Sequence, residues 1–199
     1  MDSIDLDNAA ERAAQEEAKY KDIYAGEVRC GSEILFFERV SLYENRLSVM
    51  LPKSYKDLPK ALAKMKYPME NRPAVIKTNA DTTVNIAFAY HKQAFSEAQV
   101  ESAAKGLKEG LARMTPGARF LDTRILKTLE GIKFSCFEFF STGLDAEAYH
   151  LFGFVPVHGQ FLHFIFNAPA ELARTWQPVA LQVCESVREI DKENDLKGR

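Results

Sequence analysis

The alternation of hydrophobic and polar residues is clearest between residues 83 and 91. Successive side chains of a strand point to opposite faces of a sheet, so this period of two predicts a β-strand with two different faces. The larger residues gather on one face, which indicates a strand that is half-buried or covered by a helix. The two sets are Val84, Ile86, Phe88 and Tyr90 on one face, and Asn85, Ala87 and Ala89 on the other.

The second half of the chain contains four longer β-prone segments, at residues 124–129, 132–142, 148–157 and 160–167. The breaks between them are short enough for hairpins and contain glycine, so we expect neighbouring strands to pair antiparallel. His163 is the only polar residue between Phe161 and Phe166. This pattern predicts a central strand that is covered on both faces of the sheet.

The first half of the chain combines shorter β-prone segments with one helical pattern. The β-prone segments are residues 34–37, 40–43, 47–51 and 74–78. Leu58, Leu62 and Met65 recur at helical spacing, and Pro59 suits a first helical position, so residues 53–66 are predicted to contain a helix.

Two longer amphipathic helices are predicted, at residues 97–114 and 175–190. Ser96 and Gln99 form a capping-box pattern before the first helix, and Thr175 is the expected N-cap of the second, with Pro178 in its first turn. Gly106 and Gly110 are expected to allow close packing of the first helix on the sheet. The expected buried residues are Val100, Ala104, Leu107, Leu111 and Met114 in the first helix, and Trp176, Val179, Ala180, Val183, Val187 and Ile190 in the second.

The order of elements is strands, helix, strands, helix, which predicts an α+β fold with a central antiparallel sheet flanked by helices. The chain has 199 residues, of which 46% are hydrophobic, so one domain with a substantial core is expected. We place this domain at residues 25–191. An acidic, helical or frayed N-terminal arm is expected at residues 1–24, and a charged tail at residues 192–199.

Several local segments resemble the PsbP-like fold group, which includes the photosystem II protein PsbP, Ran-binding Mog proteins and bacterial DcrB-like proteins. The resemblance covers residues 33–190. It rests on Leu47-Ser-Val-Met-Leu-Pro52, on Lys66-Tyr-Pro with Arg72-Pro73, and on the closing segment from Phe166-Asn-Ala to Trp176-Gln-Pro178 and Ser186-Val187. It implies a sandwich of helices around the sheet, used as a non-catalytic docking scaffold, in a group with many uncharacterised bacterial members. It implies no shared catalytic residue.

Charge and cysteine content narrow the expected partners. The formal net charge is −2, which gives no reason to expect a nucleic acid or an anionic membrane as a partner. The three cysteines, Cys30, Cys136 and Cys184, have no zinc or disulfide spacing, so neither a metal nor another cofactor is expected. The first residues lack the pattern of a signal peptide, and a cytoplasmic location is the expectation.

Few residues are candidates for catalysis or metal binding, and most of them have a simpler structural interpretation. His150, His158 and His163 lie on or beside predicted strands, but their spacing is not that of a zinc site. Cys136 is expected to be a buried, inert thiol rather than a nucleophile. Glu138 lies among phenylalanines, where burial would raise its pKa, although exposure at a sheet edge is the commoner situation for a glutamate.

The segment at residues 60–73 is the predicted partner-binding site. Tyrosine, methionine and arginine are enriched at interfaces, and two prolines reduce the entropy lost when a loop becomes ordered on binding. The neighbouring lysines would provide a positive rim for an acidic protein partner, although an ordinary solvated lysine face explains the same pattern. The candidate residues are Lys60, Lys64, Lys66, Tyr67, Met69 and Arg72, with Lys53 and Lys56 nearby.

Three functional hypotheses follow. The first is a cytoplasmic adaptor module that docks a protein partner on the 60–73 segment. The second is a small-ligand-binding protein or an enzyme that uses a pocket between sheet and helix, around His150, His163 and Glu138. The third is a structural protein that self-associates through the N-terminal arm. The sequence leaves the oligomeric state open.

Overall fold

The computed structural model describes residues 22–143 and 146–191. Its helices are α2 (Lys60–Lys66), α3 (Val100–Met114), the 3₁₀ turn η1 (Ala170–Leu172) and α4 (Ala173–Glu185). Its strands are β1 (Glu27–Cys30), β2 (Glu33–Leu42), β3 (Leu47–Pro52), β4 (Lys56–Asp57), β5 (Val75–Thr78), β6 (Asn85–Ala94), β7 (Arg119–Phe120), β8 (Arg124–Lys127), β9 (Lys133–Thr142), β10 (Glu147–Val157), β11 (Gln160–Pro169) and β12 (Arg188–Glu189).

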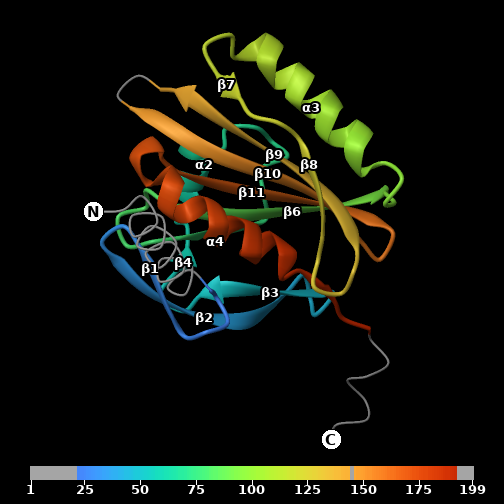
Figure 1. The fold of residues 1–199 in the computed structure, drawn as a ribbon, viewed down its shortest axis with the longest axis horizontal. Coiled ribbons are helices and arrows are strands. Elements are labelled where there is room, and N and C mark those ends of the chain that lie inside the picture. The colour runs from blue at the N-terminus through green and yellow to red at the C-terminus, as the bar shows by residue number, and fades with distance from the viewer. Residues whose placement is uncertain (1–21, 144–145, 192–199) are drawn as a thin grey trace, which may run out of the picture.

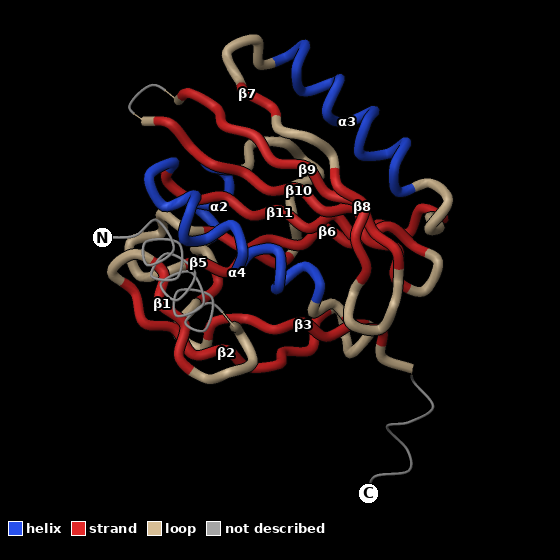
Figure 2. The backbone as a smooth tube through the Cα atoms, viewed as in Figure 1, coloured by secondary structure: helices blue, strands red, loops and turns tan. Residues whose placement is uncertain are grey.

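A large antiparallel sheet forms the centre of the molecule (Figure 2). Its strands are ordered β4-β5-β6-β11-β10-β9-β7, and β8 also pairs with β9. The predicted hairpins between β8, β9, β10 and β11 are confirmed, and β11 is central because it pairs with both β6 and β10. A second, smaller sheet has the order β1-β2-β3-β12, so the segment after α4 returns to pair with β3.

One face of the central sheet is covered by α4 and the small sheet (Figure 1). We call it the closed face. Phe164 and Phe166 of β11 point to this side, where Trp176, Val179 and Val183 of α4 meet them in one continuous core. Trp176 is fully buried, as its position in the predicted stripe implied, and its ring lies 5.4 Å from that of Phe166. The strand alternation therefore places the largest hydrophobic cluster between the central sheet, α4 and the small sheet.

The opposite face, which we call the open face, is covered in two separate places. Val100 and Ala104 of α3 pack on phenylalanines of β9 and β10. At the other end, Leu62 and Ala63 of α2 pack against residues of β5, β6 and β11. The prediction that β11 is covered on both sides is thus only partly right, because the two helices lie over different strands and leave sheet surface between them.

The starts of α2 and α3 and the burial of one residue differ from the expectation. α3 begins at Val100 rather than at residue 97, and its N-cap is Gln99. α2 begins at Lys60, after Pro59. Residues 56–57 before it form the strand β4, and the flanking Tyr55 and Leu58 are buried. Met114, which was expected to be buried, ends α3 with 74% of its surface exposed.

The last helix also departs from the sequence prediction. α4 begins at Ala173 rather than Thr175, so Pro178 lies inside the helix, and no side chain caps its N-terminus. It ends at Glu185, with Ser186 as its C-cap. The amide of Ser186 donates to the carbonyls of Gln182 and Val183, the amide of Val187 donates to the carbonyl of Cys184, and β12 then starts at Arg188. The helical stripe could not show that the buried Val187 lies beyond the helix.

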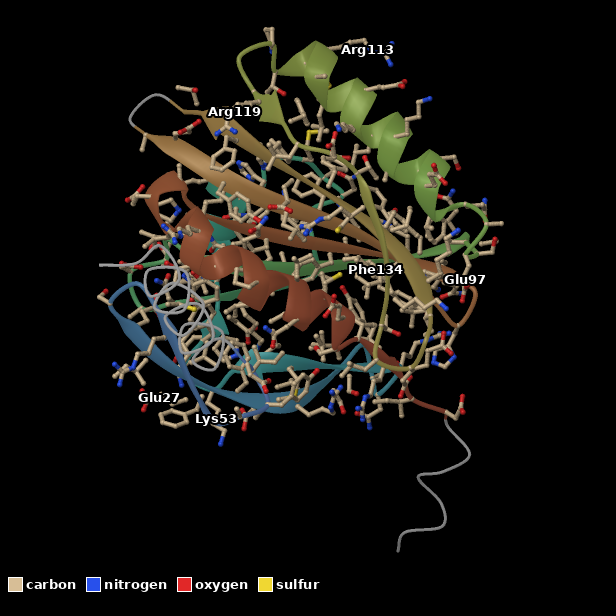
Figure 3. The ribbon with its side chains drawn as sticks, viewed as in Figure 1. Glu27, Lys53, Glu97, Arg113, Arg119 and Phe134 are labelled. Carbon is tan, nitrogen blue, oxygen red and sulfur yellow. The ribbon has the colours of Figure 1, made fainter. Side chains whose placement is uncertain are left out.

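The outer surfaces carry polar and charged side chains (Figure 3). Glu27 and Lys53 lie at the outside of the small sheet, and the guanidinium of Arg119 stacks 4.2 Å from the centre of the Phe140 ring. None of the described helices is long and apolar enough to cross a membrane. The predicted N-terminal arm and C-terminal tail fall almost entirely outside the described residues.

Candidate functional site

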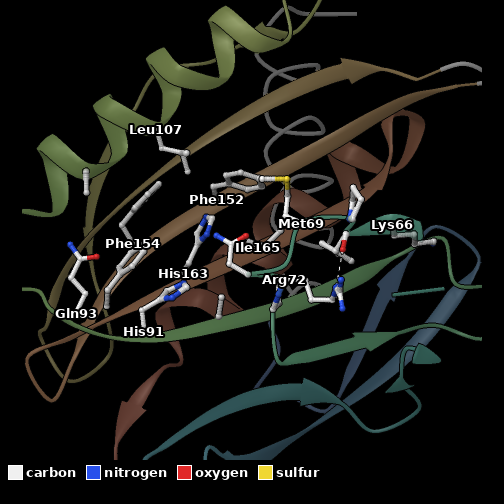
Figure 4. Close-up of a pocket in the computed structure, with 17 residues that line it drawn as sticks. Lys66, Met69, Arg72, His91, Gln93, Leu107, Phe152, Phe154, His163 and Ile165 are labelled. Atoms are coloured by element: carbon white, nitrogen blue, oxygen red, sulfur yellow. Dashed lines mark hydrogen bonds between the residues drawn. The ribbon is translucent and has the colours of Figure 1, made fainter. Parts of the chain in front are cut away.

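A groove of about 660 Å³ lies on the open face, between α3 and the loop that follows α2 (Figure 4). We call it the sheet groove. Its floor is made by neighbouring strands: His91 of β6, Phe161 and His163 of β11, and Phe152 and Phe154 of β10. Leu107 of α3 forms one wall, and residues 66–69 and 71–73 form the other. The groove occupies the sheet surface that α2 and α3 leave uncovered.

His163 lies in the centre of this floor and is surrounded by aromatic rings. The rings of Phe152, Phe154 and Phe161 lie 5.0, 5.3 and 5.9 Å from its own. Its Nε2 atom is buried and has no hydrogen-bond partner in the described part of the chain. Burial, together with the nearby His91, lowers the pKa of His163 to about 3, so the ring is neutral at physiological pH.

His91 and Gln93 are groove residues that the sequence analysis missed. His91 stacks on Phe161, with ring centres 5.5 Å apart and planes at 17°. Both residues line the groove beside Ala89 of the same strand. The alternation that placed Asn85, Ala87 and Ala89 on one face of β6 continues to residues 91 and 93. That signal could have identified both side chains.

The loop wall is held by hydrogen bonds within the chain. The Tyr67 hydroxyl accepts a hydrogen bond of 2.8 Å from Asn167 Nδ2, and Arg72 Nε donates one of 3.1 Å to the Tyr67 carbonyl. Burial raises the pKa of Tyr67. Tyr67 therefore fixes the loop to β11, while the two terminal guanidinium nitrogens of Arg72 have no hydrogen bond to the described residues. Lys66 donates to the Thr82 carbonyl.

A second groove, of about 510 Å³, lies on the other side of Arg72. We call it the lysine groove. Lys60, Lys64 and Arg72 line it, with Leu58 and Ile76 as hydrophobic surface. Its one acidic residue, Asp57, is paired with Lys77 at 2.7 Å.

The structure thus divides the predicted partner-binding residues between the two grooves. Lys60 and Lys64 belong to the lysine groove, Lys66, Tyr67 and Met69 to the sheet groove, and Arg72 to both. Met69 is largely exposed, at 68% of its surface.

The predicted grouping of His150, His163 and Glu138 is wrong. His150 lies on the open face, where its ring stacks on Phe139 with centres 4.4 Å apart, whereas Glu138 belongs to the closed face. Burial lowers the pKa of His150 to about 4, and its Nε2 lies 2.8 Å from Ser141 Oγ. An enzyme site built on these three side chains is excluded by their positions on opposite faces.

Glu138 is also not at an exposed sheet edge, since only 3% of its surface is accessible. Its carboxylate accepts hydrogen bonds from Tyr149 at 2.7 Å and from Gln177 of α4 at 2.8 Å, and it pairs with Arg124. Burial, with the adjacent Glu138, raises the pKa of Tyr149 far above its usual range. Three partners satisfy the carboxylate, which explains how a charged group is accommodated beside the core.

The other candidate groups have structural roles. His158, at the hairpin before β11, places Nε2 2.9 Å from the Arg46 carbonyl and lies beside Glu189 of β12. Cys136 is buried, as predicted, and burial raises the pKa of its thiol to about 11, which suppresses the reactive thiolate. Within residues 22–143 and 146–191, no cluster of three potential metal ligands is found.

Comparisons with known proteins identify the fold. No family model and no curated protein matches the sequence. Cyanobacterial PsbP from Synechocystis sp. PCC 6803 matches with a TM-score of 0.56 and 12% identity, over 80% of this chain and 95% of that protein. The Saccharomyces cerevisiae Ran-binding protein Mog1p gives 0.51 and 11%, over 80% and 98%. LpqN, involved in cell envelope biogenesis of Mycobacterium tuberculosis, gives 0.50 and 14%, over 79% and 92%. The resemblance predicted from the sequence is confirmed at the level of the fold.

Proposed function

We propose that this chain, which has the PsbP-like fold, is a non-catalytic binding module that docks an acidic protein partner on the lysine groove. The observation that carries this proposal is the convergence of Lys60, Lys64 and Arg72 around one concave surface. The scaffold is compatible with such a role, because Mog1p, with the same fold, is a Ran-binding protein.

The charges in the lysine groove favour an acidic ligand. α2 contains three lysines and no acidic residue, and none of its residues is buried. The carboxylate of Asp57 is already paired with Lys77, so it opposes an incoming acidic side chain less than an unpaired aspartate would. Complementary charge mainly raises the association rate and selects the partner, and it makes binding sensitive to salt.

The hydrophobic part of the surface provides the remaining contact. Leu58 and Ile76 line the lysine groove but are nearly buried. The exposed hydrophobic residues of the 60–73 segment are Met65 on α2 and Met69 on the following loop, with 76% and 68% of their surfaces exposed. Exposed methionines adapt to differently shaped partners because the side chain is flexible and polarisable. An acidic segment that carries one hydrophobic side chain matches this combination.

The test is capture of proteins from the native host on immobilised wild-type chain and on the double variant Lys60→Glu, Lys64→Glu. The matched control is Lys105→Glu, Lys127→Glu, which changes the net charge equally at exposed lysines of α3 and β8. We expect one acidic protein to bind wild type and control, and to be lost from the first variant and in high salt. Equal recovery on both double variants would rule out the lysine groove as the docking surface.

A further inference from the structure

We propose that the sheet groove binds a small organic anion with a planar, apolar body, such as an aromatic carboxylate. This site adjoins the lysine groove, with which it shares Arg72 and Pro73, and it goes beyond the proposed docking function. Among the described residues, three properties of the groove carry the inference: its aromatic floor, the unpartnered nitrogen of His163, and a lining that contains Arg72 and Lys66 but no acidic residue.

The floor suits a flat apolar body. The rings of Phe154, Phe161 and His163 lie within 30° of parallel to one another, and Leu107 and Ile165 add aliphatic surface. Aromatic rings favour offset-stacked contact with another planar group. The volume of about 660 Å³ lies in the range of small-molecule sites, roughly 300–1,000 Å³.

His163 gives this floor one specific polar position. A buried nitrogen without a hydrogen bond is unfavourable, and a ligand that supplies the missing partner recovers that free energy. Because its pKa lies far below neutrality, the ring offers a neutral donor or acceptor, according to tautomer, rather than a charge. His163 therefore selects a ligand with a polar atom over the centre of the floor.

The charged groups at the groove determine the sign of the ligand. Arg72 and Lys66 line the wall opposite α3. Lys66 already donates to the Thr82 carbonyl and His163 on the floor is neutral, so Arg72 is the cation most available to a ligand. No acidic residue lines this groove within the described part of the chain. Arg72 uses Nε to hold the loop, which leaves its terminal nitrogens for a bidentate contact with a carboxylate. An anionic group at this rim and an apolar body over the aromatic floor satisfy both parts of the groove.

The test uses 2-naphthoate as the anionic probe and 2-naphthalenemethanol as its neutral counterpart, titrated calorimetrically into the full chain at neutral pH. We expect saturable binding of naphthoate with a dissociation constant of about 0.1 mM, in keeping with the efficiency of small ligands. The alcohol should bind about tenfold more weakly, because it lacks the charge-assisted contact. No saturable binding, or equal affinity for both probes, would overturn the proposal.

Variants of the groove separate the site from non-specific binding. Ala103→Trp places a large ring in the groove and should abolish naphthoate binding, whereas Ser102→Trp, on the exposed side of α3, should leave it unchanged. Arg72→Gln removes both the charge and the Nε bond that holds the loop, so it should weaken naphthoate about tenfold and the alcohol much less, with partial recovery of naphthoate binding in Arg72→Lys. Equal loss of both probes in Arg72→Gln, or equal affinity in both tryptophan variants, would contradict the assignment.

The main competing occupant is a segment of a protein partner. An acetylated acidic hexapeptide with one phenylalanine serves as the probe. If this peptide binds wild type and is lost in Ala103→Trp while naphthoate does not bind at all, the groove is a peptide site and the small-anion proposal is wrong. If naphthoate binds and the peptide does not, the proposal is supported.

Discussion

The two faces of the central sheet are formed by the same strands but are covered in different ways. On the closed face, α4 and the small sheet bury the side chains of β6, β11 and β10 in one continuous core. On the open face, α2 and α3 form two separate clusters, with the sheet groove between them. The closed face therefore accounts for most of the packing, and the open face carries the sheet groove.

Two buried ring nitrogens illustrate the difference between the closed face and the open face. Trp176 Nε1 on the closed face and His163 Nε2 on the open face both lack a hydrogen-bond partner among the described residues. Only His163 lines a groove that a ligand can enter. A missing hydrogen bond is therefore not by itself evidence of a binding site. Beside an open cavity, however, a ligand can supply the missing partner and recover the free energy lost by the unpaired nitrogen.

The largest expected contrast comes from removing one ring from each face of β11. Phe164→Ala deletes a fully buried ring of the closed face and should lower the free energy of unfolding by about 3–5 kcal/mol. Phe161→Ala removes a half-buried ring of the groove floor and should cost about 1–2 kcal/mol, since part of that ring is already in contact with water. Urea unfolding measures both values. Equal losses would contradict the division into a closed and an open face.

Adding a methyl group tests the same contrast from the other direction. A Cβ atom at Gly153 would lie 2.8 Å from Cys184 Sγ of α4 and 3.2 Å from Phe164 Cβ, so Gly153→Ala should destabilise by about 1–3 kcal/mol. At Gly106, in the middle of α3, nothing lies within 4 Å of an added Cβ. Gly106→Ala should therefore stabilise by about 0.5–1 kcal/mol through helix propensity. Thermal unfolding of the two variants shows whether the shifts have opposite signs.

A smaller effect concerns the histidines of the open face. The pKa values of His150 and His163 are about 4 and 3 in the folded chain, below the unfolded value of about 6.5. Below about pH 6.5 the unfolded chain therefore binds more protons than the folded chain. The free energy of unfolding should decrease by about 1–2 kcal/mol per histidine between pH 7 and about pH 5. The variant His150→Phe, His163→Phe should lose less stability than wild type over this interval. Identical losses, measured by urea unfolding, would show that these rings are not buried as described.

The strands were predictable because their signal is local. Alternation identified β6, and short glycine-containing breaks identified the hairpins from β8 to β11. The ends of the helices were less predictable. β12 consists of only Arg188 and Glu189 and exists because β3 offers an edge for pairing, which no local pattern encodes. The helix was therefore predicted to continue to residue 190, whereas it ends at Glu185.

The site was predictable only in part, because it depends on contacts between distant segments. Interface-type composition pointed to the 60–73 segment, which does form one wall of each groove. The environment of Glu138 depends on Arg124, Tyr149 and Gln177, which come from three other elements, so the sequence could not show that its carboxylate is buried and paired. Glycines at positions 106 and 110 suggested close helix packing, but both have open space around them. The spacing of two glycines does not reveal which side of a helix meets a sheet, whereas the hydrophobic stripe correctly placed Val100 and Ala104 in that contact.

Methyl NMR during titration with 2-naphthoate distinguishes an open face that binds ligands from a closed face that is only structural. We expect saturable shifts of the methyl groups of Leu107, Ile165 and Met69, which line the sheet groove. Leu151 and Leu162, fully buried in the closed-face core, should remain unchanged. Shifts centred on Leu151 and Leu162, or none at saturating probe, would contradict this assignment of the two faces.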